Sequence, residues 1–153
     1  MADLQLSDNF HLSEFITSDT AARLNRTIDV VEGDDIWTAL KAQCVHILEP
    51  IYAEFGSKRI TSGFRPLWLN RLVGSADNSQ HVMGEATDFS CPGHKNLDVA
   101  LWIAEFNVPF DQVILEGTWV HVSYSLQHPP RGSILTARFH PGEKTEYLTG
   151  IVP

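Results

Sequence analysis

Apolar residues recur at helical spacing in the first half of the chain. In residues 34–56, DDIWTALKAQCVHILEPIYAEFG, apolar side chains lie four or seven positions apart, which is typical of an amphipathic helix. Gly56 is a suitable end for this helix, because glycine readily adopts the left-handed conformation that often closes one. Pro50 has no backbone N–H to donate, so we expect it to kink or divide the helix.

Three shorter segments are also predicted to be helical. Residues 18–25, SDTAARLN, begin with Ser18, whose hydroxyl is suited to cap the helix. Residues 66–74, PLWLNRLVG, carry proline in the first turn, where its missing N–H costs little. Residues 96–107, NLDVALWIAEFN, form a helix that presents four apolar residues on one face: Leu97, Ala100, Leu101 and Ala104.

The second half of the chain contains shorter apolar runs that favour strands. We predict strands over residues 58–64, 85–91 and 132–139, followed by an extended tail. Residues 111–124, DQVILEGTWVHVSY, are predicted to form two strands around a tight turn. Because helices come first and short strands cluster later, the pattern predicts an α+β fold with a central, mostly antiparallel sheet flanked by helices. A single domain over residues 1–153 is expected, since this length can enclose one sizeable core.

Composition narrows the possible classes of protein. Hydrophobic residues make up 43% and charged residues 20% of the chain, which indicates a globular rather than a disordered protein. The net charge of −8 and the absence of a basic stripe argue against a nucleic-acid partner. No apolar stretch is long enough to span a membrane, and the N-terminus lacks a secretory signal pattern, so we expect synthesis in the cytoplasm. Cys44 and Cys91 have no CxxC spacing and are expected to be buried free thiols.

A histidine and an aspartate seven residues apart are the first candidate metal ligands. They lie in the segment SQHVMGEATD, in which Gly84 lets the chain turn after His81 without steric cost. In the strand that follows, Asp88 shares its face with the small Ala86, which leaves room for an ion. A zinc site still needs a third ligand, and a catalytic zinc site also needs an open fourth position.

The predicted hairpin offers that third ligand. If Gly117 and Thr118 form a two-residue turn, Ile114 faces His121 on the neighbouring strand. Glu116 then lies diagonal to His121, at about 7 Å between backbones, which long side chains can bridge. The histidine can therefore bind a metal, while the carboxylate can act as general base toward a water molecule that the metal acidifies.

Three segments, in this order and spacing, resemble the zinc D-alanyl-D-alanine peptidase family. They are SGFRP (62–66), NSQHVMGEATDF (78–89) and EGTWVHVSY (116–124). These enzymes are peptidoglycan carboxypeptidases and endopeptidases, related in fold to the hedgehog signalling domain and the lysostaphin-type peptidases. The opening segment, LSDNFHLSEFITSDTAARLN (6–25), is similar to that of the small phage and bacterial branch. The resemblance covers most of residues 4–125 and implies a hedgehog/DD-peptidase-like fold.

The resemblance also implies roles for individual residues. A zinc ion would be bound by three side chains that match the family's ligands: His81, Asp88 and His121. Glu116 matches the general base, and Arg65 matches the arginine that binds the substrate or polarises its carbonyl. Ser79 matches a serine that lines the site, and Trp119 either walls the cleft or belongs to the core.

The acidic residue departs from the family's pattern. Many members place it three residues before the last histidine, whereas Glu116 lies five residues before His121. The hairpin register keeps Glu116 on the metal face, so we retain it as the base, with Asp111, deeper in the strand, as the alternative. The remaining histidines match no family position and are expected to be surface or core residues: His11, His46, His94, His128 and His140.

The resemblance implies a zinc metallopeptidase that cleaves a peptide bond in the stem or cross-link of bacterial peptidoglycan. A D-Ala-D-Ala carboxypeptidase, a cross-link endopeptidase and an L-Ala-D-Glu endopeptidase are all compatible with it. Because no secretory signal is present, we expect a monomeric phage endolysin that a separate pore-forming protein releases to the wall. The alternatives are a virion-associated wall hydrolase and a non-catalytic zinc-binding module of the same fold. The presence of both Glu116 and Arg65 argues against the non-catalytic module.

Overall fold

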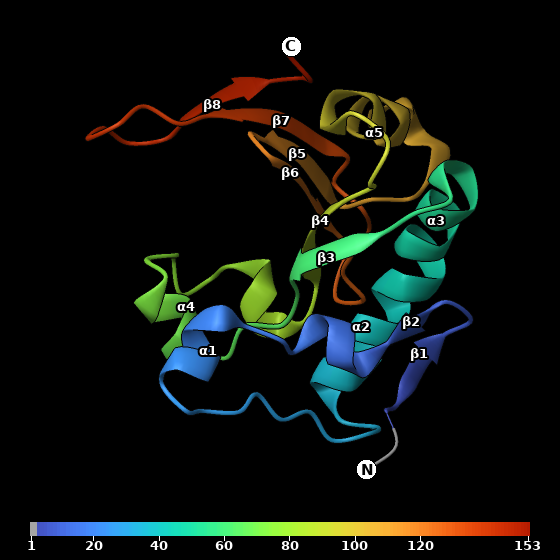
Figure 1. Ribbon diagram of the computed structural model, residues 1–153. Helices are drawn as coiled ribbons and strands as arrows, with labels where there is room; N and C mark the ends of the chain where they lie inside the picture. Colours follow the sequence, from blue (N-terminus) through green and yellow to red (C-terminus); the bar gives the residue numbers. More distant parts are fainter. Residues whose placement is uncertain (1–2) are drawn as a thin grey trace.

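The computed structural model describes residues 3–153, and its centre is a six-stranded sheet (Figure 1). The strands are β3 (Arg59–Ser62), β4 (Ala86–Ser90), β5 (Gln112–Glu116), β6 (Trp119–Ser123), β7 (Ser133–Arg138) and β8 (Glu146–Thr149). Their order across the sheet is β3-β4-β6-β5-β7-β8. Strands β5 and β7 run parallel, and the other four neighbouring pairs are antiparallel. The predicted α+β fold with a mostly antiparallel sheet is confirmed.

Helices pack around this sheet. The α-helices are α1 (Asp19–Arg23), α2 (Asp35–Gln43), α3 (Glu49–Phe55), α4 (Leu67–Leu72) and α5 (Asn96–Trp102). Shorter 3-10 and π-helical segments are η1 (Leu12–Phe15), η2 (Cys44–Leu48), η3 (Gln80–Met83) and η4 (Ile103–Asn107). In Figure 1, α3 and α5 lie on one side of the sheet, whereas α1 and α4 lie together at the lower left. Within residues 3–153, no helix is both long and apolar enough to cross a bilayer.

The long predicted helix is divided in the way that its proline suggests. Helices α2 and α3 are separated by the π-helical turn η2, and Pro50 lies at the start of α3. Proline has no N–H to donate to the carbonyl of His46, so the regular α-helical ladder is interrupted at this point. Gly56 ends α3 with a φ of 73°, the left-handed conformation expected for it. In α1, the Ser18 hydroxyl accepts a hydrogen bond from the Ala21 N–H, so the predicted N-cap is also confirmed.

Two of the predicted helices differ in detail from the structure. Pro66 occupies the N-cap position of α4 rather than its first turn. In α5 and η4, the residues that face the core are Val99, Ala100 and Ile103, whereas Leu101 is exposed. The predicted apolar face was therefore rotated by about one residue. Apolar residues stand on more than one side of this segment, so their spacing alone does not decide which side faces the core.

The sheet has one face toward the core and one face toward a cleft. Phe89 of β4, Val113 of β5, and Val120 and Val122 of β6 are buried in the main apolar cluster. Helix α5 packs on β5 and β6. On β4, Thr87 donates a hydrogen bond to Gln43 of α2, which ties this face to the helices. Because side chains alternate along a strand, the intervening residues of all three strands project from the other face.

Two pairings were not predicted from the sequence. The strands β1 (Gln5–Ser7) and β2 (Phe10–His11) form a small antiparallel sheet that packs near α2 and η2. The tail, which was predicted to be extended, contributes β8 and pairs it antiparallel with β7. Both cysteines, Cys44 and Cys91, are buried free thiols as expected.

Candidate metal centre

The predicted hairpin register is observed between β5 and β6. Glu116 pairs with Trp119 across the two-residue turn, and Ile114 pairs with His121. On the other side of β6, His121 pairs with Asp88 of β4. The histidine and the aspartate therefore lie directly opposite each other on the cleft face of the sheet.

His81 joins this pair from η3. The Ser79 hydroxyl caps this turn by accepting a hydrogen bond from the His81 N–H. Gly84 then closes the turn with a φ of 72°, so the chain reverses into β4 where the sequence predicted it to. As a result, His81 and Asp88 approach each other although seven residues separate them.

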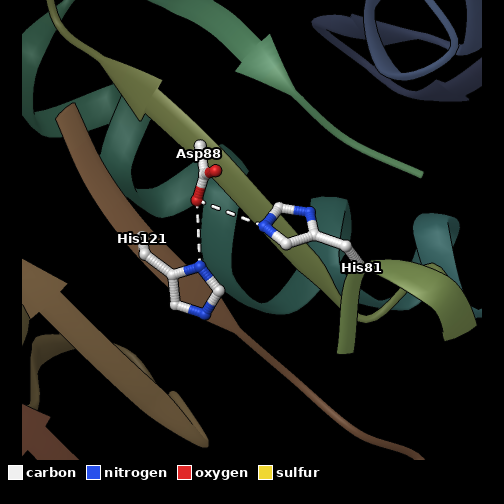
Figure 2. Close-up of side chains that lie close together, drawn as sticks. All are labelled: His81, Asp88 and His121. Atoms are coloured by element: carbon white, nitrogen blue, oxygen red, sulfur yellow. Dashed lines mark hydrogen bonds and ion pairs between the residues drawn. The ribbon is translucent and has the colours of Figure 1, made fainter. Parts of the chain in front are cut away.

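The three side chains form a compact cluster, in which they point toward one another (Figure 2). The Asp88 Oδ1 atom lies 2.9 Å from His121 Nδ1 and 3.3 Å from His81 Nε2. All three residues are buried, and their ligand atoms lie within 4.8 Å of one another. Two imidazole nitrogens and one carboxylate oxygen at this spacing are suited to hold a metal ion.

The backbone fixes which nitrogen of His81 can bind a metal. Its Nδ1 atom lies 2.8 Å from the carbonyl oxygen of Gly63, a group that can only accept a hydrogen bond. Nδ1 therefore carries the proton, and the lone pair of the neutral ring is on Nε2, facing Asp88. A second partner of this kind is usual for metal-binding histidines, because it orients the ring. The donor set thus fits a metal ion in both chemistry and orientation.

Charge in the cluster favours an ionised carboxylate. Burial opposes ionisation of Asp88, but the neighbouring His81 and His121 together hold the pKa of its carboxyl well below the ordinary value. The aspartate is therefore negatively charged at neutral pH, as a metal ligand must be.

Glu116 stands beside the cluster without belonging to it. Its Oε1 atom lies 3.9 Å from His121 Nδ1, which matches the diagonal position predicted for it. Burial raises the pKa of Glu116, with Asp88 adding to this effect while His121 and Arg65 oppose it. A carboxylate with a raised pKa is better suited to exchange protons near neutral pH than a solvent-exposed one.

Arg65 is a cationic side chain in the loop that also contains Gly63. Its backbone N–H donates to the carbonyl of His81, and its Nε–H donates to Oδ1 of the buried Asn70. Burial lowers the pKa of the guanidinium, and the carboxylates of Asp88 and Glu116 oppose this. Since arginine starts from a very high pKa, it stays protonated and faces the two carboxylates.

A cleft of about 630 Å³ opens over the cluster. All seven residues predicted for the site line it: Arg65, Ser79, His81, Asp88, Glu116, Trp119 and His121. Trp119 is half-buried and packs against Phe139, with ring centroids 5.8 Å apart, so it walls the cleft rather than filling the core.

Several lining residues were not predicted from the sequence. They are Gln80, Gln112, Arg131, Phe139 and Tyr147, and three of them come from the C-terminal part of the chain. The three C-terminal residues belong to no local motif and reach the cleft through the pairing of β7 with β5, whereas Gln80 lies beside His81 in η3 and Gln112 lies on β5. Phe139 and Tyr147 are about half exposed.

Asp111, the alternative base, lies outside the cleft lining. Its carboxylate is fully buried and bonded to Arg131 and Gln80. The five remaining histidines lie outside the metal cluster as expected, and four of them are exposed: His46, His94, His128 and His140.

Comparison with known proteins agrees with this geometry. A search of curated proteins found no match. The family model described as Peptidase M15 matches residues 8–123, which include β3, β4, β5, β6 and every residue of the metal cluster. Since the match spans most of the chain, this protein belongs to the Peptidase M15 family.

Proposed function

We propose that this protein is a zinc peptidase that hydrolyses a peptide bond in the stem or cross-link peptides of bacterial peptidoglycan. One observation carries the proposal. The buried cluster of His81, Asp88 and His121 opens into a cleft that also holds a carboxylate, Glu116, and a guanidinium, Arg65. Membership of the Peptidase M15 family supports the peptidase chemistry.

The ligand set supports zinc as the metal. Two histidines and one carboxylate are typical of catalytic zinc sites, which keep a further position open toward the substrate. When bound, zinc would supply a Lewis acid and lower the pKa of a water molecule toward neutrality. His81 Nε2, Asp88 Oδ1 and His121 Nδ1 are the atoms that face the site.

Glu116 is suited to move the proton in this reaction. Its carboxylate lies on the metal face but 3.9 Å from the nearest histidine nitrogen, so it can reach a water molecule without taking a ligand's place. It would accept a proton from the attacking water and deliver it to the amine that leaves. The raised pKa that burial gives Glu116 makes it a stronger base toward the water molecule.

Arg65 is suited to stabilise negative charge on the substrate. Its Nε–H is bonded to Asn70, whereas its two terminal nitrogens make no hydrogen bond to residues 3–153. A guanidinium held at one edge and free at the other can donate to the carbonyl oxygen as it gains charge. Ser79 and Trp119 would line the path of the peptide.

We extend the proposal to a biological role as a phage endolysin. The likeness of residues 6–25 to the small phage and bacterial branch supports it. An endolysin accumulates in infected cells and acts after a pore-forming protein opens the membrane, whereas a virion-associated hydrolase is carried by the particle. Immunoblotting of infected cells and purified particles separates the two roles.

The biochemical proposal is tested by zinc content and by the products of cell-wall digestion. The purified protein should hold about one zinc ion per chain, and a chelator should abolish release of peptide fragments that mass spectrometry identifies. His81→Ala should lose both zinc and activity, whereas the exposed control His140→Ala should keep both. Zinc binding without digestion of any wall preparation would support the non-catalytic module instead.

A further inference from the structure

A second arginine borders the cleft away from the β5–β6 turn. Arg131 lies in the loop between β6 and β7, outside the residues matched by the family. It lines the same cleft as the metal cluster, together with Gln80 and Gln112, and its side chain is 54% exposed. The family's pattern assigns no role to it.

A buried carboxylate fixes the orientation of this arginine. Asp111 Oδ1 accepts hydrogen bonds from the Arg131 backbone N–H at 2.9 Å and from its Nε–H at 3.0 Å. Asp111 Oδ2 accepts from Arg131 Nη2 at 2.7 Å and from Gln80 Nε2 at 3.0 Å. Because Asp111 is fully buried, the guanidinium covers its charge and presents only its own outer edge to the cleft.

The outer edge of the Arg131 guanidinium has N–H groups without strong hydrogen-bond partners among residues 3–153. Across residues 3–153, the Nη1 group of Arg131 makes no hydrogen bond, and Nη2 has only a long contact of 3.4 Å to Gln80 Oε1 beyond Asp111. An arginine clamped on one side and open on the other is preorganised for a planar anion, since little side-chain freedom remains to be lost on binding. A carboxylate is the anion that fits this fork and that a peptide supplies.

Strand β5 runs along the cleft and sets the distance between the Arg131 end and the metal cluster. Gln112, near Arg131, and Glu116, beside the metal cluster, lie on the same face of β5 four residues apart. Four residues of antiparallel strand span about 13 Å. An extended peptide of three to four residues covers a similar distance, at roughly 3.3–3.6 Å per residue.

We propose that Arg131 binds a carboxylate of the substrate peptide, several residues from the bond that is cut. This inference rests on the proposed function, because it takes the substrate to be a peptide held along β5. It assigns the Arg131 end of the cleft to an acidic group.

The test compares two peptides and two matched variants. The substrates are a synthetic peptidoglycan stem peptide with free carboxylates and the same peptide with those carboxylates converted to amides. For Arg131→Gln, KM for the free peptide should rise roughly tenfold to a hundredfold, the usual range for losing a hydrogen bond to a charged group. Its kcat should change little, and on the amide peptide the variant should match the unmodified protein.

Arg71→Gln is the control. Arg71 also binds an aspartate through Nε and Nη2, at 3.0 and 2.8 Å from Asp77, but it lies outside the cleft lining. Exposed pairs of this kind contribute little, so both kinetic constants should stay within about twofold. Zinc content and melting temperature of each variant establish that it is folded. If Arg131→Gln, which uncovers the buried Asp111, does not fold, the double variant Asp111→Asn/Arg131→Gln removes that charge as well and takes its place in the same comparison.

The outcomes separate this inference from the proposed function. If Arg131→Gln loses activity equally on both peptides, Arg131 only stabilises the loop between β6 and β7, and the inference is overturned. If the unmodified protein cleaves neither peptide, the proposed function fails for them, and calorimetric binding of the same peptides takes the place of kinetics. Weaker binding of the free peptide by Arg131→Gln would then support the carboxylate site. Equal binding by both proteins, or no binding at all, would rule it out.

Discussion

The Asp88 carboxylate contacts both imidazoles of the metal cluster through a single oxygen, Oδ1. Two contacts set this arrangement: Asp88 pairs with His121 in the sheet, and His81 Nδ1 lies against the carbonyl oxygen of Gly63. Both arise from backbone geometry rather than from the metal. Backbone geometry therefore limits the side-chain freedom that the three residues would lose on binding a metal.

Replacing Glu116 separates proton transfer from metal binding. Glu116→Gln keeps the size and hydrogen bonding of the side chain but cannot accept a proton at neutral pH. Loss of a general base typically costs on the order of 10²–10⁴ in rate. The variant should fold and bind zinc normally, as measured by melting temperature and metal content, while wall hydrolysis falls by this factor.

Two comparisons accompany that variant. Glu143→Gln removes an exposed carboxylate outside the cleft lining and should leave the rate unchanged. Asp111→Asn should weaken substrate binding through Arg131 but leave kcat largely intact. An inactive Asp111→Asn beside an active Glu116→Gln would instead identify Asp111 as the base.

At the scale of elements, the site depends on how closely two loops approach each other. Gly63 follows β3, and its carbonyl holds His81, whereas its α-carbon lies against the backbone of Phe15 in η1. A β-carbon at Gly63 would lie 2.7 Å from both the Cα and O atoms of Phe15, which is closer than such atoms approach. The glycine therefore permits a contact between η1 and the loop that orients a metal ligand.

Gly63→Ala should weaken both stability and metal binding. Relieving the clash requires the backbone to move, and overpacking of this kind costs about 1–3 kcal/mol. Displacing the carbonyl that holds His81 should lower zinc affinity by roughly tenfold to a hundredfold, as is typical when a metal ligand loses its second partner. Thermal unfolding and competition with a metal-binding dye measure the two effects.

Gly142→Ala controls for stability alone. Gly142 has a φ of 76°, which strains any other residue, but open space surrounds it and it lies outside the cleft lining. It should lower the melting temperature without changing zinc affinity. Unchanged zinc affinity in Gly63→Ala would show that the carbonyl of Gly63 does not orient His81.

Local rules explain why the metal cluster could be predicted from the sequence. The turn at Gly84, the alternation that leads to Asp88, and the two-residue turn before His121 each depend on a few neighbouring residues. The face of α5 was predicted less well, because apolar residues stand on more than one side of this helix. Arg131 was not predicted, because its position beside the cleft depends on the pairing of β5 with β7, which are distant in sequence.

At the scale of the whole molecule, the C-terminal residues complete both the sheet and the cleft. The family match ends at Ser123, but β7 pairs with β5 along residues 112–116. The same C-terminal part supplies Arg131, which covers the buried charge of Asp111. Without it, β5 would be an edge strand, and a carboxylate would remain buried without its partner.

A chain ending at residue 125 should therefore aggregate. An exposed row of unpaired N–H and C=O groups on β5 is a template for pairing with other chains, and an uncompensated buried charge adds roughly 3–5 kcal/mol of destabilisation. A chain ending at residue 139 keeps both β7 and Arg131 and should remain largely soluble. Size-exclusion chromatography with light scattering compares the two, and a monomeric, folded chain ending at residue 125 would contradict the argument.

The parallel pairing of β5 with β7 also has a consequence for synthesis on the ribosome. Every residue of the metal cluster precedes Val122, whereas the strand that covers β5 begins at Ser133. At about 5–20 residues per second, the part of the chain after Ser123 takes seconds to be added, while earlier segments can already fold. Strand β5 therefore stays an open edge until these last residues have been added and β7 can pair with it. Protection of this edge from aggregation is thus one of the last steps in making the protein.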